Sequence, residues 1–88
     1  MPPFIPASER IIRARDLIQQ ARDLPVPAES GRSDLSYIAK VKDLLQQARD
    51  MVKFIPYTPS ATPEIKSEVS KIYQEADQAN KDIFYARQ

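Results

Sequence analysis

Eight prolines divide the chain, and their grouping constrains the fold more than any other feature of the sequence. They stand at positions 2, 3 and 6, at 25 and 27, and at 56, 59 and 63. Proline removes a backbone donor and breaks helix interiors. Long helices are therefore expected only in the intervening stretches 7–24, 28–55 and 64–88.

Apolar residues in these stretches recur every three or four positions, which is typical of amphipathic helices. The first predicted helix, about 8–24, has a stripe formed by Ile11, Ala14, Ile18 and Ala21, widened by Ile12 and Leu17. The second, about 34–55, has Ile38, Val41, Leu45, Ala48, Val52 and Ile55, widened by Leu44 and Met51. The third, about 63–87, has a heptad stripe of Ile65, Val69, Ile72, Ala76, Ala79, Ile83 and Ala86. These stripes are the predicted core.

Residues with capping side chains stand where the helices are expected to begin. Ser8 is the expected cap of the first helix, Ser33 or Asp34 that of the second, and Thr62 that of the third. The proline that follows Thr62 suits the first position of a helix. The prolines after the first two helices are expected to end them.

A twelve-residue segment occurs twice, since residues 13–24 align without gaps on residues 40–51 with seven identities. A weaker third copy begins at Glu68. This predicts a repeated helix–loop unit, and the short connections favour antiparallel neighbours. We therefore expect an all-α, up-down-up three-helix bundle, with residues 1–7 as a proline-rich arm and residues 8–88 as a single domain.

The composition excludes several kinds of functional site. The chain has no Cys and no His, which excludes disulfides, the usual zinc sites and cysteine redox chemistry. There is no glycine-rich phosphate loop and no paired-carboxylate motif in an apolar setting. A bundle this small has little room for a ligand pocket, which usually exceeds about 300 Å³. We expect no catalytic residues, no metal and no cofactor.

The cellular location is predicted from the lack of cysteine, of a signal peptide and of a membrane span in the sequence. Small secreted domains are usually rich in disulfides, and the first residues lack the basic region and apolar run of a signal peptide. No apolar stretch approaches the roughly 18 residues of a membrane span. The sequence therefore predicts a cytoplasmic protein without a membrane span.

Aromatic residues near the C-terminus are the features most suggestive of a binding surface. Tyr73 and Phe84 share one stripe beside the heptad seam, and Tyr85 follows Phe84 directly. Either these rings pack internally against Phe4 and the loop of Tyr57, or they present an apolar patch to a partner. The candidate partner-binding residues are thus Tyr73, Phe84, Tyr85, Phe4 and Tyr57. The predicted function is a non-enzymatic protein–protein interaction or assembly module, which binds another protein or a second copy of itself through helix faces.

Charge suggests an alternative function. The 13 basic and 12 acidic residues are interleaved, whereas a dedicated nucleic-acid binder usually has a clearly basic patch. If the first two helices lie side by side, Arg15, Arg22, Lys42 and Arg49 form a candidate site for nucleic acid or acidic lipid. Two of these arginines belong to the duplicated Gln-Gln-Ala-Arg-Asp at 19–23 and 46–50, whose polar residues are also explained as solvated helix surface.

Overall fold

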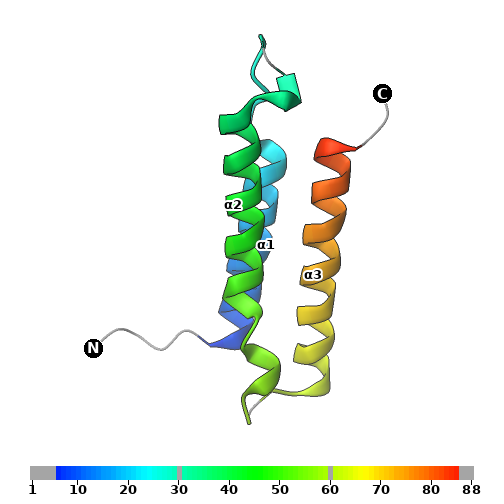
Figure 1. Ribbon diagram of the computed structural model, residues 1–88. Helices are drawn as coiled ribbons and strands as arrows, with labels where there is room; N and C mark the ends of the chain where they lie inside the picture. Colours follow the sequence, from blue (N-terminus) through cyan, green and yellow to red (C-terminus); the bar gives the residue numbers. More distant parts are fainter. Residues whose placement is uncertain (1–5, 30, 60, 86–88) are drawn as a thin grey trace, which may run out of the picture.

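The computed structural model describes residues 6–29, 31–59 and 61–85, and it contains three long helices that run side by side (Figure 1). Helix α1 spans Ala7–Asp23, α2 spans Leu35–Val52 and α3 spans Pro63–Phe84. Short 3-10 turns, η1 at Gly31–Ser33 and η2 at Ile55–Tyr57, lie in the two connections. No strand occurs in the described ranges. The all-α, up-down-up three-helix fold is confirmed, and its origin in a repeated unit stays a prediction.

One apolar core runs the length of the bundle between the three helices. Its buried residues are Ile11, Ala14, Ile18 and Ala21 of α1, Tyr37, Val41, Leu45, Ala48 and Val52 of α2, Ile55 of η2, and Val69, Ile72, Ala76, Ala79 and Ile83 of α3. The core alanines are fully buried and allow the helix axes to approach closely. Within the described part of the chain, no polar or charged residue is buried.

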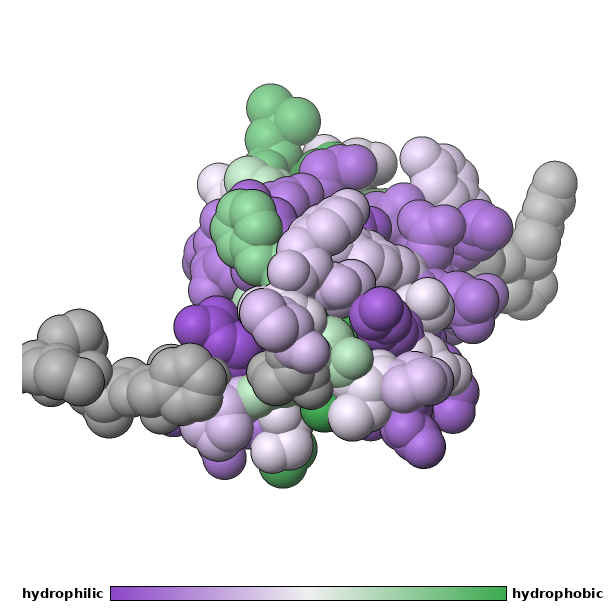
Figure 2. All heavy atoms as spheres, turned by 90° about the horizontal axis from the view of Figure 1, so that it is seen from below, coloured by the Kyte–Doolittle hydropathy of each residue, from purple (hydrophilic) through white to green (hydrophobic). Residues whose placement is uncertain are grey.

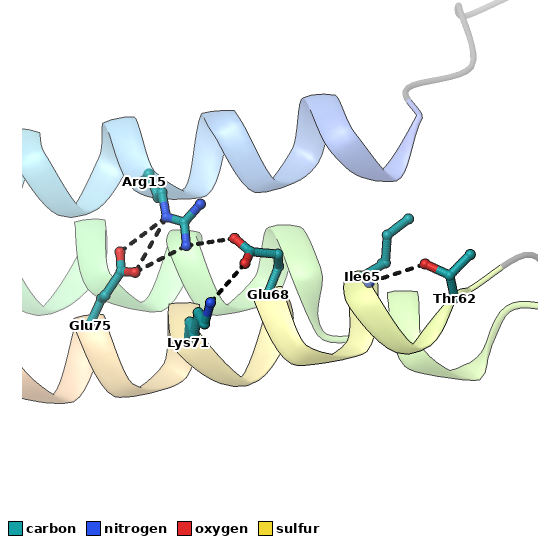
Figure 3. Close-up of polar contacts among 6 residues, drawn as sticks. All are labelled: Arg15, Thr62, Ile65, Glu68, Lys71 and Glu75. Carbon is teal, nitrogen blue, oxygen red and sulfur yellow. Dashed lines mark hydrogen bonds and ion pairs between the residues drawn. The ribbon is translucent and has the colours of Figure 1, made fainter.

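Two of the predicted caps are confirmed. The side chain of Asp34 accepts a hydrogen bond from the backbone N–H of Tyr37, 3.0 Å away. The hydroxyl of Thr62 accepts one from the backbone N–H of Ile65 at 3.2 Å (Figure 3). Each satisfies a donor that has no partner inside its own helix. The starts of α2 and α3 therefore follow from local sequence alone.

The predicted cap of the first helix, Ser8, is wrong. Helix α1 begins one residue earlier, at Ala7, and its cap residue is Pro6, which makes no side-chain capping bond. The backbone carbonyl of Pro6 accepts hydrogen bonds from the N–H groups of Glu9 and Arg10, both at 3.1 Å. Pro6 has the extended backbone that a cap requires, so the serine falls inside the first turn.

The helix ends also differ from the prediction. Helix α2 stops at Val52, three residues early, and the chain tightens into η2, which still places Ile55 in the core. Helix α3 stops at Phe84. The predicted core residue Ala86 and residues 1–5 of the predicted arm lie outside the described residues.

The predicted core needs three corrections, one of which is that Ile65 of the third stripe is only half-buried, although it packs against the core. Ile12 is 55% exposed, because it lies about 100° around the helix from Ile11 and points away from the bundle. Tyr37 is buried, whereas its neighbour Ile38 is only half-buried. Other predicted flanking residues pack against the core as expected: Leu17, Leu44 and Met51.

Candidate functional site

Ion pairs connect α1 to α3 along one side of the bundle. The guanidinium of Arg15 donates to both carboxylate oxygens of Glu75, at 3.1–3.3 Å. Its Nη2 also lies 2.9 Å from Glu68, and Lys71 reaches the second oxygen of Glu68 at 3.2 Å (Figure 3). A single arginine therefore bridges two acidic residues of α3.

The same arrangement recurs one heptad further along. Arg22 Nη1 donates to Asp82 at 3.0 Å. The two arginines are seven residues apart, and so are Glu75 and Asp82. Both contacts join residues that are sixty positions apart, as expected for parallel helices in one register. These ion pairs therefore fix the alignment of α1 against α3.

The ion pairs shift the ionisation of their members. Hydrogen bonding to Glu75 raises the pKa of Arg15, although partial burial opposes the rise. Hydrogen bonds from Arg15 and Lys71 lower the pKa of Glu68. The pKa of Asp82 is lowered first by a hydrogen bond from Gln78 and then by Arg22. The carboxylates of Glu68 and Asp82 are therefore favoured in their charged form.

Contacts of a different kind connect α2 to α3. Arg49 Nη2 lies 3.9 Å from Asp77. Lys42 Nζ lies 5.4 Å from the centre of the Phe84 ring, within the range of a cation–π interaction. The Phe84 ring in turn meets Tyr37 edge-on, with 6.4 Å between ring centres and 71° between planes. Phe84 is thus engaged within the bundle.

The four predicted anion-binding residues do not form one basic surface. Arg15 and Arg22 lie on the α1 side of α3, and each meets α3 carboxylates. Lys42 and Arg49 lie on the α2 side, where they contact an α3 ring and an α3 carboxylate. The cations that the sequence grouped together are therefore used at two separate helix–helix seams.

The predicted partner-binding residues are likewise distributed. Phe84 packs against the core, and Tyr85, 71% exposed, follows it at the end of α3. Tyr57, 84% exposed, lies in the α2–α3 connection at the opposite end of the bundle (Figure 1). Tyr73 lies partway along α3 and is 37% exposed. Phe4 lies outside the described residues.

The α2–α3 connection carries an exposed aromatic pair that the sequence did not reveal. Phe54 is 69% exposed, and Tyr57 is three residues further along. Phe54 is the cap residue of η2 and Tyr57 is its last residue, so one short turn carries both rings. Between them, Ile55 is only 5% exposed and anchors the turn in the core.

Hydrogen bonds hold this turn in place. The N–H of Tyr57 donates to the carbonyl of Phe54 at 3.1 Å. The carbonyl of Ile55 accepts two hydrogen bonds from Thr58, one from the backbone N–H at 3.1 Å and one from the hydroxyl at 2.8 Å. The backbone beneath the two rings is therefore fixed by local bonds and by the buried isoleucine.

A lysine completes this cluster. Lys53 Nζ lies 5.1 Å from the centre of the Phe54 ring and 3.3 Å from the carboxylate of Asp50. We call Lys53, Phe54 and Tyr57 together the aromatic end. The α2–α3 contacts pair Arg49 with Asp77 in an antiparallel register, so four residues further along α2, Lys53 comes level with Tyr73. Tyr73 is therefore roughly level with Lys53 along the bundle axis.

Figure 2 shows the bundle from the side of the α2–α3 connection, the end that carries η2. Hydrophobic side chains stand singly on this face among hydrophilic and neutral ones, and they do not merge into a broad apolar sheet. Aromatic residues are enriched among the residues that dominate binding energy at protein–protein interfaces.

The described residues offer little for small-molecule or metal chemistry. A pocket of about 240 Å³ at the α1–α2 connection is lined by Leu24, Pro25, Pro27, Asp34, Ser36, Tyr37 and Lys40. A depression of about 380 Å³ is lined by residues of α3 alone: Pro63, Glu64, Ser67, Glu68 and Lys71. Among the described residues, no group of three or more acidic side chains is arranged to hold a metal ion.

The helices of the described ranges lack the combination of length and apolar character that crossing a bilayer requires. Comparison of the chain with protein-family models, with curated proteins and with solved structures found no match in any of the three. The candidate site is therefore identified from the geometry of this molecule alone.

Proposed function

We propose that the chain is a non-enzymatic protein-binding module whose binding surface is the aromatic end. The observation that carries the proposal is the exposed pair Phe54 and Tyr57, held on a turn that buried Ile55 anchors. Large aromatic rings bury about 150–250 Å² each when covered. On the free protein most of this area faces water, and a protein partner supplies the apolar contact.

The rigidity of the turn favours binding. A partner that meets a flexible loop must order it, and each immobilised side chain costs about 0.5–1.5 kcal/mol. Here the backbone is already fixed by the hydrogen bonds of Tyr57 and Thr58. Aromatic residues have few rotatable bonds and are enriched among residues that dominate binding energy. Phe54 and Tyr57 are therefore suited to act as anchors.

Binding of an anionic surface through helices α1 and α2 is the alternative function predicted from the sequence. It has less support, because Arg15, Arg22 and Arg49 face carboxylates of α3. Nucleic acid or lipid would have to compete with these intramolecular partners. We therefore place the alternative second.

The proposal is tested by site-specific crosslinking followed by a binding measurement. A photoreactive amino acid replaces Tyr57 in one variant and Leu35 in a control, since Leu35 is 82% exposed but lies at the other end of the bundle. We expect a discrete protein adduct at position 57 only. The captured protein, once purified, should bind Phe54→Ser at least tenfold more weakly than wild type and bind Leu35→Ser equally well. Equal adducts at both positions, or unchanged affinity of Phe54→Ser, would refute the proposal.

A further inference from the structure

From the two ends of the bundle we infer that the partner of the aromatic end is a second copy of the chain, and that Tyr57 of one copy enters the pocket at the α1–α2 connection of the other. This inference rests on the proposed function, because it names the partner of the same surface. The contact joins different surfaces of two identical molecules, which makes it a heterologous contact.

The pocket has the size of a site for one side chain. Its volume is about 240 Å³, whereas sites for small molecules usually exceed about 300 Å³. It lies at the α1–α2 connection, and η2 lies at the opposite end of the bundle (Figure 1). Helix α2, which separates the two, has 18 residues and is about 27 Å long at about 1.5 Å per residue. Tyr57 therefore cannot reach the pocket of its own chain, but it can reach that of a second copy.

The lining of the pocket suits a tyrosine. Its apolar walls come from the α1–α2 connection: Leu24, Pro25 and Pro27. Its polar groups come from the start of α2: Asp34, Ser36 and Lys40. A tyrosine ring has an apolar body and a hydroxyl that needs a hydrogen-bond partner when it is buried. The pocket offers both kinds of contact to Tyr57, whose side chain is 84% exposed in the single chain.

The second ring also has an apolar neighbour at this end. Val26 lies between the two prolines of the pocket wall and is 43% exposed. Phe54, which shares a turn with Tyr57, is 69% exposed. With Tyr57 in the pocket, the Phe54 ring covers the apolar edge beside it.

Charge does not oppose contact between copies. The chain has a net charge of +1, so two copies repel each other only weakly. At the aromatic end, Asp50 and Lys53 lie 3.3 Å apart, and the pocket is lined by Asp34 and Lys40. Each surface thus has one lysine and one aspartate beside its apolar part, and a lysine of one copy can face an aspartate of the other.

The area of the contact determines its strength. Two large rings bury about 300–500 Å² when they are covered, and a similar area is covered on the other copy. The total, below about 1,000 Å², is less than the roughly 1,200–2,000 Å² of stable protein–protein interfaces. We therefore expect a weak association that depends on protein concentration.

Two complementary variants test the contact. Phe54→Ser/Tyr57→Ser keeps the pocket but lacks the rings, and Ser36→Trp keeps the rings but fills the pocket. Ser36 is exposed, so the bundle should tolerate the tryptophan. In light scattering up to millimolar concentration, the mass of the wild type should rise, each variant alone should stay monomeric, and their equimolar mixture should form dimers. A wild type that stays monomeric, or a mixture that does so while the wild type associates, would overturn the inference.

Leu35→Trp is the matched control. Leu35 lies about 160° around α2 from Tyr37, which lines the pocket, so the same ring is added on the other side of the helix. This variant should associate like the wild type. Equal loss of association in both tryptophan variants would overturn the assignment of the pocket.

Nuclear magnetic resonance locates the contact in the mixture. Isotope-labelled Phe54→Ser/Tyr57→Ser is titrated with unlabelled Ser36→Trp, and we expect the amide resonances of Ser36 and Lys40 to shift. With the labels exchanged, the amides of Ile55 and Thr58 should shift instead. Shifts confined to other parts of the bundle would contradict the inference.

The outcomes also distinguish this inference from the proposed function. If the adduct formed at position 57 contains a different protein that requires Phe54, the inference fails and the proposed function stands. The same holds if copies associate through the rings but ignore the filled pocket. If copies associate equally well without the rings and position 57 gives no adduct, both fail.

Discussion

Two aromatic pairs lie at opposite ends of the bundle, and they are built from the same kinds of residue. At one end, Phe84 meets Tyr37 edge-on and Lys42 lies 5.4 Å from the Phe84 ring centre. At the other, Phe54 and Tyr57 share a turn and a lysine lies 5.1 Å from the Phe54 ring centre. The first pair packs into the core, whereas the second is largely exposed.

The difference lies in how many elements supply each pair. Tyr37 comes from α2 and Phe84 from α3, so their contact joins two helices and stabilises the fold. Phe54 and Tyr57 come from one short connection, and their exposed faces meet no second helix over most of their area. The pair drawn from two helices contributes to the fold, whereas the pair on one turn leaves most of its area exposed.

The largest loss of stability is expected when the Tyr37–Phe84 pair is broken. Tyr37→Ala removes a side chain that is only 6% exposed, and truncation of a buried aromatic costs about 3–5 kcal/mol. Urea unfolding followed by circular dichroism should show this loss. Tyr85→Ala is the control, since Tyr85 is 71% exposed and should change stability by less than about 0.5 kcal/mol. Similar losses in both variants would contradict the comparison.

A smaller loss of stability is expected when only the contacts of the Phe84 ring are removed. Phe84→Leu keeps most of the apolar volume but removes the edge-on contact with Tyr37 and the cation–π contact with Lys42. Such contacts contribute about 0.5–1.5 and 0.5–1 kcal/mol respectively, so we expect a loss of about 1–2 kcal/mol in the same unfolding measurement. A double-mutant cycle with Lys42→Gln separates the two terms. Additive single losses would show that the lysine does not interact with the ring.

Much of the fold follows directly from the sequence. The prolines delimit three helices, and Asp34 and Thr62 mark two of the helix starts because their capping bonds are local. The stripes predict most of the core correctly. The sequence could not show that Tyr37 rather than Ile38 is buried, because both positions continue the helical spacing. The edge-on contact with Phe84 accounts for the burial of the tyrosine.

The candidate site was harder to predict for a similar reason. Helical spacing shows that Tyr73 and Phe84 share a stripe, but it does not show that Phe84 meets α2 or that Tyr57 lies at the other end. Phe54 lies two residues after the end of α2 and adjoins a proline-containing turn, and this is its only signal in the sequence. The charge pairing did have a sequence signal, since Arg15 and Arg22 repeat with the same seven-residue spacing as Glu75 and Asp82.

A still smaller effect is expected from pH at the α1–α3 seam. Glu68 and Asp82 have pKa values below their ordinary 4.5 and 3.8, through hydrogen bonds from Arg15 and Gln78 first of all. A carboxylate with a lowered folded-state pKa stabilises the fold above its ordinary pKa, and this stabilisation is lost as pH falls through the folded value. The melting temperature should therefore decline by a few degrees below about pH 4.5.

The double variant Arg15→Gln/Arg22→Gln measures how much of this acid-induced fall in melting temperature comes from the α1–α3 ion pairs. This variant should melt slightly lower than wild type at pH 7 and should show a shallower fall with acid. The gap at pH 7 should narrow in 1 M salt, where the Debye length is about 3 Å. A gap that persists in high salt would mean that packing by the arginine stems outweighs their charge.

The smallest effect on stability is expected at the aromatic end. Phe54 and Tyr57 are 69% and 84% exposed, so Phe54→Ser/Tyr57→Ser removes little buried area, and the free energy of unfolding should stay within about 0.5 kcal/mol of wild type. A loss above about 2 kcal/mol would show that these rings stabilise the bundle. The two ends would then be alike, and the reason for assigning binding to one of them would be gone.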